Sequence, residues 1–147
     1  MGAAAFLIFP HQPPTPPRID PNYAGIPEAG EAAFKTYCSR CHRIQTPSGD
    51  ILAGAGSDAG PNLWGVIGRT AGSSEYRYSS TMVNAGETGL VWNKNAISNY
   101  VADPNGYLQA HLNDDSVRGK MSFRLNTSAA PYAAKDIAAY LQTLSNS

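Results

Sequence analysis

The order of apolar and polar residues predicts helices at three places in this chain of 147 residues. The clearest is "SAAPYAAKDIAAYLQTL", where apolar side chains recur three or four positions apart and a proline, Pro131, lies near the start. In "IPEAGEAAFKTY", Pro27 suits a first helical position and acidic residues follow it, which favours a helix that runs toward Cys38. The segment "NKNAISNYVADP" predicts a short helix that begins near Asn93 and ends before Pro104.

The rest of the chain is rich in loop-forming residues. No stretch keeps the two-residue alternation of a half-buried strand, and there is no internal repeat. The segment "TPSGDILAGAGSDAGPN", residues 46–62, predicts a long loop, which is unusual in a compact domain unless the loop wraps something. With 14 glycines in all, the chain predicts an all-α fold of a few helices and long loops, with a large apolar ligand in the middle.

The first 25 residues have a different character. An apolar run at residues 3–9 is too short to span a bilayer and lacks the basic residues that precede the apolar region of a signal peptide. Six prolines follow within residues 10–21 and predict an extended spacer. We therefore predict a tail at 1–25 and one globular domain at 26–147. The apolar run is then the trimmed end of a signal or anchor, a segment that packs on a partner, or a disordered terminus.

Charge narrows the choice of partners. Lys and Arg together number 11, as do Asp and Glu, so the formal net charge is zero. A chain with no overall field is not expected to bind nucleic acid or an acidic membrane surface. Any charged docking surface has to be local.

The only two cysteines lie in "TYCSRCHRI", with a histidine directly after the second. A redox dithiol is usually found at a helix N-terminus beside parallel strands, but here the pair follows a helix. Zinc needs at least three protein ligands, and only His11, His42 and His111 are available to join the cysteines. Covalent haem explains every residue, because Cys38 and Cys41 attach the porphyrin and His42 meets the iron. This interpretation is favoured, and the other two remain as alternatives.

A c-type haem needs a second axial ligand. Met82 is better explained as a core residue, because methionine fills apolar gaps well. Met121 lies in the loop before the last helix and can approach the iron from the side opposite His42. His111 is the competing ligand, since haem iron accepts either side chain.

With these motifs, residues 27 to 145 resemble the class I cytochrome c family, close to its mitochondrial and alphaproteobacterial type. "GEAAFKTYCSRCH" resembles the N-terminal helix of that family, and "KDIAAYL" resembles the C-terminal helix that contacts it. "GPNLWGVIGRTAG", "YRYSSTM", "LVWNKNAISNYVADPNGY" and "GKMSF" follow in the expected order.

The resemblance implies a class I cytochrome c fold around one covalent haem, and it favours Met121 over His111. The carbonyl of Pro61 would accept the imidazole N–H, and Arg69 would lie near a haem propionate. Tyr78 and Trp92 would donate hydrogen bonds to propionates, and Tyr100 would neighbour the methionine. The implied haem-binding residues are Cys38, Cys41, His42, Pro61, Arg69, Tyr78, Trp92, Tyr100, Met121 and Phe123, with His42 and Met121 as the iron ligands.

Three features depart from the family pattern. The polar stretch "LQAHLNDDSV", residues 108–117, lengthens the interval before the methionine. The usual Pro-Gly-Thr-Lys before that methionine is Val-Arg-Gly-Lys here. The ring of surface lysines is absent, although Arg118, Lys120 and Arg124 form a small basic cluster. The encounter with a partner should therefore depend less on salt.

A haem with both axial positions filled has no open site for a substrate, which predicts an electron-transfer protein and not an enzyme. The predicted function is one-electron transfer between redox proteins of the periplasm or an equivalent exported compartment. The alternative is a fixed haem subunit of a larger dehydrogenase or membrane respiratory complex, docked or anchored through residues 1–25. A peroxidase would need Met121 to leave the iron, and no distal acid–base pair is recognisable.

Overall fold

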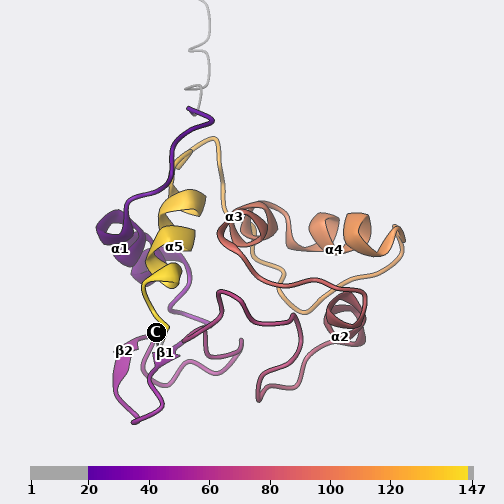
Figure 1. The fold of residues 1–147 in the computed structure, drawn as a ribbon, viewed down its shortest axis with the longest axis horizontal. Helices are drawn as coiled ribbons and strands as arrows, with labels where there is room; N and C mark the ends of the chain where they lie inside the picture. Colours follow the sequence, from indigo (N-terminus) through magenta and orange to yellow (C-terminus); the bar gives the residue numbers. More distant parts are fainter. Residues whose placement is uncertain (1–19, 146–147) are drawn as a thin grey trace, which may run out of the picture.

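The computed structural model describes residues 20–145, and these form five helices and one small two-stranded sheet (Figure 1). In chain order, the elements are α1 (Pro27–Tyr37), β1 (Ile44–Gln45), β2 (Ile51–Ala53), α2 (Ser80–Glu87), α3 (Lys94–Ala102), α4 (Pro104–Leu112) and α5 (Ala133–Gln142). Most of the regular elements are helices, and this confirms the all-α prediction. No helix among these residues combines the length and the apolar composition needed to cross a bilayer.

The helices at the two ends of the described chain, α1 and α5, pack side by side (Figure 1). They approach so closely at Gly30 that a Cβ there would lie 1.8 Å from the carbonyl oxygen of Asp136. One turn further along α1, Phe34 is fully buried, and its ring centroid lies 6.0 Å from that of Tyr140. The contact between the first and last helices is the one that the family resemblance implied.

A buried carboxylate on α5 fixes the point where α1 begins. Asp136 Oδ1 accepts a hydrogen bond from the Tyr23 hydroxyl at 2.5 Å and another from the backbone N–H of Ile26 at 2.8 Å. Ile26 directly precedes α1 and provides no side-chain cap of its own. Residues 20–25, assigned to the tail from the sequence, therefore include a contact with α5. The remainder of the predicted tail, 1–19, lies outside the described residues.

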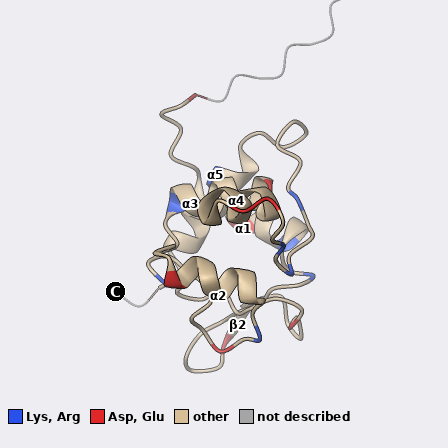
Figure 2. Cartoon of the chain, turned by 90° about the vertical axis from the view of Figure 1, so that its right-hand side faces the viewer, with Lys and Arg blue, Asp and Glu red and all other residues tan. Residues whose placement is uncertain are grey.

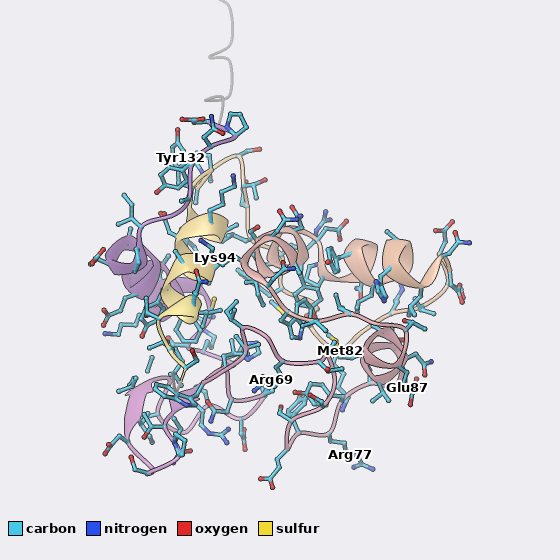
Figure 3. All side chains as sticks on the ribbon, in the orientation of Figure 1. Arg69, Arg77, Met82, Glu87, Lys94 and Tyr132 are labelled. Carbon is cyan, nitrogen blue, oxygen red and sulfur yellow. The ribbon has the colours of Figure 1, made fainter. Side chains whose placement is uncertain are left out.

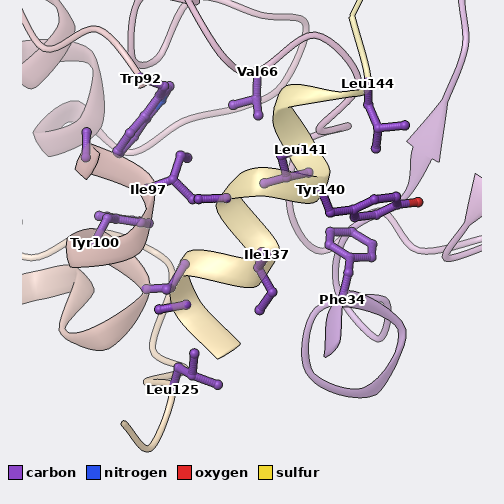
Figure 4. Close-up of a cluster of buried hydrophobic side chains, with 14 of the residues drawn as sticks. Phe34, Val66, Trp92, Ile97, Tyr100, Leu125, Ile137, Tyr140, Leu141 and Leu144 are labelled. Carbon is purple, nitrogen blue, oxygen red and sulfur yellow. The ribbon is translucent and has the colours of Figure 1, made fainter. Parts of the chain in front are cut away.

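The hydrophobic core lies on both sides of α5. Figure 4 shows Ile97 and Tyr100 of α3 on one side of this helix and Phe34 of α1 on the other. Trp92, just before α3, packs against Tyr100 with ring centroids 4.9 Å apart. The buried side chains form one cluster, and several of them also line a central cavity.

Two of the five helices were not predicted from the sequence. α2 is rich in Ser, Thr, Asn and Gly, which are weak helix formers, but Ser79 caps it by accepting the N–H of Met82 at 3.1 Å. α4 begins at Pro104, the residue expected only to end the previous helix, and Asp103 caps it by accepting the N–H of Gly106 at 3.2 Å. The stretch 108–117 is therefore part helix and part loop.

The other helices follow the predictions with small shifts. α3 is capped by Asn93, which accepts the N–H of Ala96 at 2.8 Å, and α5 begins two residues after Pro131. The predicted loop at 46–62 contains β2, which pairs with β1 in antiparallel register, Ile44 opposite Ala53. Strands of two and three residues are too short to produce a visible alternation of apolar and polar positions.

We predict that Tyr23→Phe lowers the free energy of unfolding by about 1 kcal/mol at neutral pH, because the Asp136 carboxylate loses a donor. That hydrogen bond raises the pKa of Tyr23 to about 12, above its value of about 10 in an unfolded chain. The stabilisation is therefore fully present below pH 10 and is lost as the pH rises toward 12.

Urea unfolding of the wild type and of Tyr23→Phe between pH 7 and 11 measures this difference in the free energy of unfolding. Groups that titrate in both proteins cancel when the two are subtracted. Tyr132→Phe is the matched control, because Tyr132 is the ring neighbour of Tyr23 at 4.7 Å. The control should show neither the loss nor its pH dependence. A Tyr23→Phe difference that stays constant up to pH 11 would contradict the assigned hydrogen bond.

Candidate functional site

The two cysteines and the adjacent histidine form a tight turn directly after α1. Cys38 is the residue that ends the helix, and its carbonyl oxygen accepts the N–H of Cys41 at 3.1 Å and that of His42 at 2.9 Å. The two thiols form no disulfide with each other. This turn brings Cys38 and His42 to the wall of the central cavity, while Cys41 remains exposed beside it.

The central cavity encloses about 810 Å³ of space free of protein atoms, including its mouth. Most of the wall is apolar and comes from α1, α3, α5 and the loop after Pro61. The apolar side chains of the wall are Phe34, Leu63, Val66, Ile97, Val101, Ile137 and Leu141.

A second, outer opening adjoins this cavity, and four residues line both spaces. The shared residues are Cys38, His42, Lys120 and Met121. Cys41 and Phe123 line the outer opening only, and the Phe123 side chain is 39% exposed. All ten predicted site residues therefore line these two adjoining spaces. Eight of them line the inner cavity.

The imidazole of His42 is held in one orientation. Its Nδ1 lies 2.8 Å from the carbonyl oxygen of Pro61, so Nδ1 carries the proton and donates it to that bond. Burial lowers the pKa of His42, partly opposed by the same hydrogen bond, and so favours the neutral ring. A neutral ring protonated at Nδ1 keeps a free lone pair at Nε2, which is the state of a metal ligand.

Gly60 completes the support of this ring and was not identified from the sequence. A Cβ at this position would lie 2.4 Å from His42 Cε1 and 2.7 Å from Nδ1. Gly60 also donates its N–H to the carbonyl oxygen of Cys41 at 2.8 Å. The only signal in the sequence is that this glycine precedes Pro61, which marks a turn but not a contact with an imidazole.

Sulfur and aromatic side chains occupy other parts of the wall. Met121 lines both spaces, whereas Met82 lines only the inner cavity. Tyr100 is buried in the inner cavity, and this burial raises the pKa of its phenol. His111 lines neither space. It lies on α4 with Nε2 3.0 Å from Thr88 Oγ1 and 3.2 Å from the carbonyl oxygen of Ala85.

One end of the inner cavity is rich in hydrogen-bond donors. Arg69 donates to the carbonyl oxygens of Asn62 at 3.2 Å and Trp64 at 3.4 Å, and burial lowers the pKa of its guanidinium. Within residues 20–145 no carboxylate forms an ion pair with Arg69. Figure 3 shows Arg69 and Met82 in the interior of the molecule, between the helices and the lower loops. A partly buried cation that forms no ion pair with the described residues suits a ligand that carries a negative charge.

Tyr78 and Trp92 line the same cavity as Arg69. The hydroxyl of Tyr78 shares a hydrogen bond with that of Ser74, a partner that the sequence did not indicate. Trp92 is only 6% exposed, so its indole presents a largely buried surface to the cavity. Aromatic side chains with one polar atom each combine apolar wall with hydrogen-bonding capacity.

Lys120, next to Met121, and Tyr76 form a link between two loops of the site, here called the Lys120 strap. Lys120 Nζ donates to the carbonyl oxygen of Arg77 and lies 5.6 Å from the centroid of the Tyr76 ring. The Tyr76 hydroxyl in turn donates to the carbonyl oxygen of Ala59 at 2.6 Å. The strap links the loop that precedes Gly60 to the loop that carries Met121, so it joins the two sides of the site.

These groups fit a haem c and argue against the two alternatives. Burial raises the pKa of Cys38 to about 12, which leaves a thiol and not the thiolate of a redox pair. In the described part of the chain no three His, Cys, Asp or Glu side chains gather as a metal site, as zinc would require. His11, the remaining candidate for zinc, lies outside the described residues. Two thiols, an imidazole, a thioether and apolar walls with a cation at one end match a porphyrin with acidic side groups.

Comparison with known proteins points the same way. The chain is 42% identical to cytochrome c-551 of Roseobacter denitrificans over 120 residues, which are 82% of this chain and 81% of that protein. It is 43% identical to cytochrome c2 of Rhodovulum adriaticum over 122 residues, 82% of this chain and 94% of that one. No family model matches the chain.

Solved structures show the same relationship. Cytochrome c2 from Rhodobacter sphaeroides superposes with a TM-score of 0.75 at 42% identity, covering 82% of this chain and 96% of that one. Ferric cytochrome c-550 from Paracoccus versutus superposes with a TM-score of 0.73 at 31% identity, covering 82% and 98%.

Replacing Gly60 with alanine should displace the His42 ring, because the new Cβ would lie 2.4 Å from Cε1. We expect Gly60→Ala to lower the free energy of unfolding by about 1–3 kcal/mol, the usual cost of overpacking. Urea unfolding measures this, with the exposed loop substitution Ala55→Ser as a control that should change stability by less than about 0.5 kcal/mol. Equal stability of the two variants would show that the ring can move without cost.

Proposed function

The chain belongs to the class I cytochrome c family as a relative of the cytochromes c2, and on that basis we propose that Cys38 and Cys41 attach its haem, with His42 and Met121 as axial ligands. It is a monohaem c-type cytochrome and an electron carrier. The observation that carries the ligand proposal is the hydrogen bond from His42 Nδ1 to Pro61, which orients a neutral imidazole in a cavity that Met121 also lines.

When bound, the haem supplies a one-electron couple at its iron. His42 and Met121 would hold the iron from the protein, which would leave no position for a substrate. The thioether of Met121 is a soft ligand that favours the reduced iron and raises the potential. Apolar side chains from α1, α3 and α5 exclude water from most of the site.

Arg69 would offset the negative charge of a propionate in this arrangement, because it is a partly buried cation whose hydrogen-bond partners among the described residues are carbonyl oxygens. Tyr78 and Trp92 offer hydrogen bonds from the same cavity wall. Tyr100, kept neutral by burial, lies in the inner cavity that Met121 also lines. These residues would hold and orient the group, and the outer opening is the proposed side for contact with a partner.

Redox proteins are the partners of such a carrier, and we propose that they dock on the outer opening. Its rim has two exposed aromatic side chains, Tyr37 and Phe123, and two cations, Arg40 and Lys120, with no carboxylate in the lining. Figure 2 shows several Lys and Arg residues gathered along one side of the molecule. A partner with an apolar centre and a few acidic residues fits this rim.

The basic cluster predicted from the sequence is smaller in the structure. Arg124 forms an ion pair with Asp103 at 3.6 Å, and Arg118 lines neither opening. Only Lys120 of the three reaches the rim. The proposed site of action is the periplasm or an equivalent exported compartment, where haem of this type is attached.

The ligand proposal predicts a specific spectrum. Haem-loaded wild type should form a c-type pyridine haemochrome and show the weak far-red band of methionine bound to ferric iron. Met121→Ala should lose the band and lower the reduction potential, because the soft ligand is gone. Met82→Leu is the matched control, since Met82 lines the same cavity, and it should keep the band.

Each alternative gives a different result in this experiment. A haemochrome without the far-red band in the wild type would favour His111 or an open coordination site. Absence of haem in a host that matures c-type cytochromes would contradict the proposal as a whole.

The docking proposal predicts an effect of charge at the rim. Arg40→Glu should slow oxidation of the reduced protein by ferricyanide, an anionic oxidant, by about two- to fivefold at low salt. The effect should largely disappear at high salt. Lys94→Glu makes the same change in net charge at a residue that lines neither opening, and should have a smaller effect. Equal slowing by both variants would indicate that only net charge matters, and would contradict a local docking surface.

A further inference from the structure

The loop that carries Met121 has no regular secondary structure of its own. Residues 113–126 form neither helix nor strand, and "VRGKM", directly before the sulfur, contains no proline to restrict its backbone. A side chain on such a segment is well placed only if the segment is held from outside. The contacts of this loop with the helices show what holds it.

Two polar side chains of α4 bind the loop on the side that leads to Met121. Asn105 Oδ1 accepts the backbone N–H of Gly119 at 2.9 Å, and Gln109 Nε2 donates to the carbonyl oxygen of Val117 at 3.0 Å. Asn105 and Gln109 are four residues apart, so they share one face of the helix. The two bonds hold Val117 and Gly119 of the loop. Gly119 lies only two positions before Met121.

Apolar packing brings the loop close enough for these bonds. Leu108, on the same helix, is fully buried, and a Cβ on Gly119 would lie 3.0 Å from its Cδ1. A residue larger than glycine at 119 would require the Leu108 side chain or the loop to shift by a few tenths of an ångström. Beyond Met121, the N–H of Leu125 donates to the carbonyl oxygen of Val101 at 2.8 Å, and Leu125 is 3% exposed. Met121 thus lies between one anchor on α4 and another on α3.

α4 is itself fixed in place and can serve as a support. Asp103 caps its first turn, and Asn113, with φ of 51°, ends it in the left-handed conformation. His111, the competing ligand candidate, instead contacts Thr88 and Ala85 of the α2 region. The lengthened segment after Tyr107 therefore supplies the end of α4 and the start of the loop that Asn105 and Gln109 bind.

We propose that Asn105 and Gln109 are positioning residues for the axial methionine, with Asn105 the more important because it binds closer to Met121. This inference rests on the proposed function, in which Met121 ligates the iron. Loss of the Asn105 bond leaves the anchor at Leu125 in place, so the loop should open on its α4 side only. The sulfur would then be displaced more readily by another ligand, while the helices stay folded.

The test uses the full haem-loaded chain and imidazole as an exogenous ligand that competes with Met121. Asn105→Ala should bind imidazole about five- to tenfold more tightly than the wild type, the effect of one lost hydrogen bond. Its far-red band should also disappear at a lower urea concentration than its helical circular dichroism signal. Asn105→Asp keeps an acceptor for the Gly119 N–H and should restore wild-type behaviour.

Asn99→Ala is the matched control, because Asn99 is an exposed asparagine of α3 and the control removes the same side chain from a helix. It should leave imidazole binding unchanged. Wild-type imidazole affinity in Asn105→Ala would overturn the inference, and so would equal effects of Asn105→Ala and Asn105→Asp. A wild type that lacks the far-red band would overturn the ligand assignment itself, which separates the failure of the proposed function from that of the positioning role.

Discussion

The close contact of α1 with α5 at Gly30 is the constraint on which the rest of this structure depends. Only a glycine allows the two helices to approach, because a Cβ would meet the backbone of Asp136 at 1.8 Å. The same contact sets Phe34 of α1 beside Ile137 and Leu141 of α5, and all three line the central cavity. Helices α1 and α5 thus form one wall of the cavity. Asp136 reinforces their contact by accepting a hydrogen bond from the N–H of Ile26, the residue before α1.

Two features of the interior, the environment of Arg69 and the apolar cavity, suit a bound cofactor. Arg69 is partly buried with carbonyl oxygens as its protein partners, and it shares a large, mostly apolar cavity with side chains of the core. A partly buried cation favours a nearby anion, and an apolar wall favours apolar contacts. A porphyrin with acidic side groups satisfies both, so the fold and the cofactor stabilise one another.

His42 and Met121, the two proposed iron ligands, are supported in different ways. On the His42 side the support is local, since Gly60 and Pro61 are consecutive, and Gly60 packs on the ring while the carbonyl oxygen of Pro61 accepts its N–H hydrogen bond. On the Met121 side the support comes from side chains of α4, from the Lys120 strap and from the backbone of α3. A loop held by several weak contacts is more easily altered than one held by adjacent residues.

The sequence by itself determined the chemistry of the site and much of the frame. Cys38, Cys41 and His42 are adjacent in the chain, and α1, α3 and α5 have apolar spacing or start and stop residues that can be recognised locally. Only the tertiary structure decided the contacts that join distant residues, such as Tyr23 with Asp136 or Asn105 with Gly119. α2 and α4 were missed because their stability comes from single capping side chains and from packing, not from a periodic pattern. A hydrogen bond between residues far apart in the chain leaves no trace in the order of apolar and polar positions, so the support of Met121 became visible only in the folded molecule.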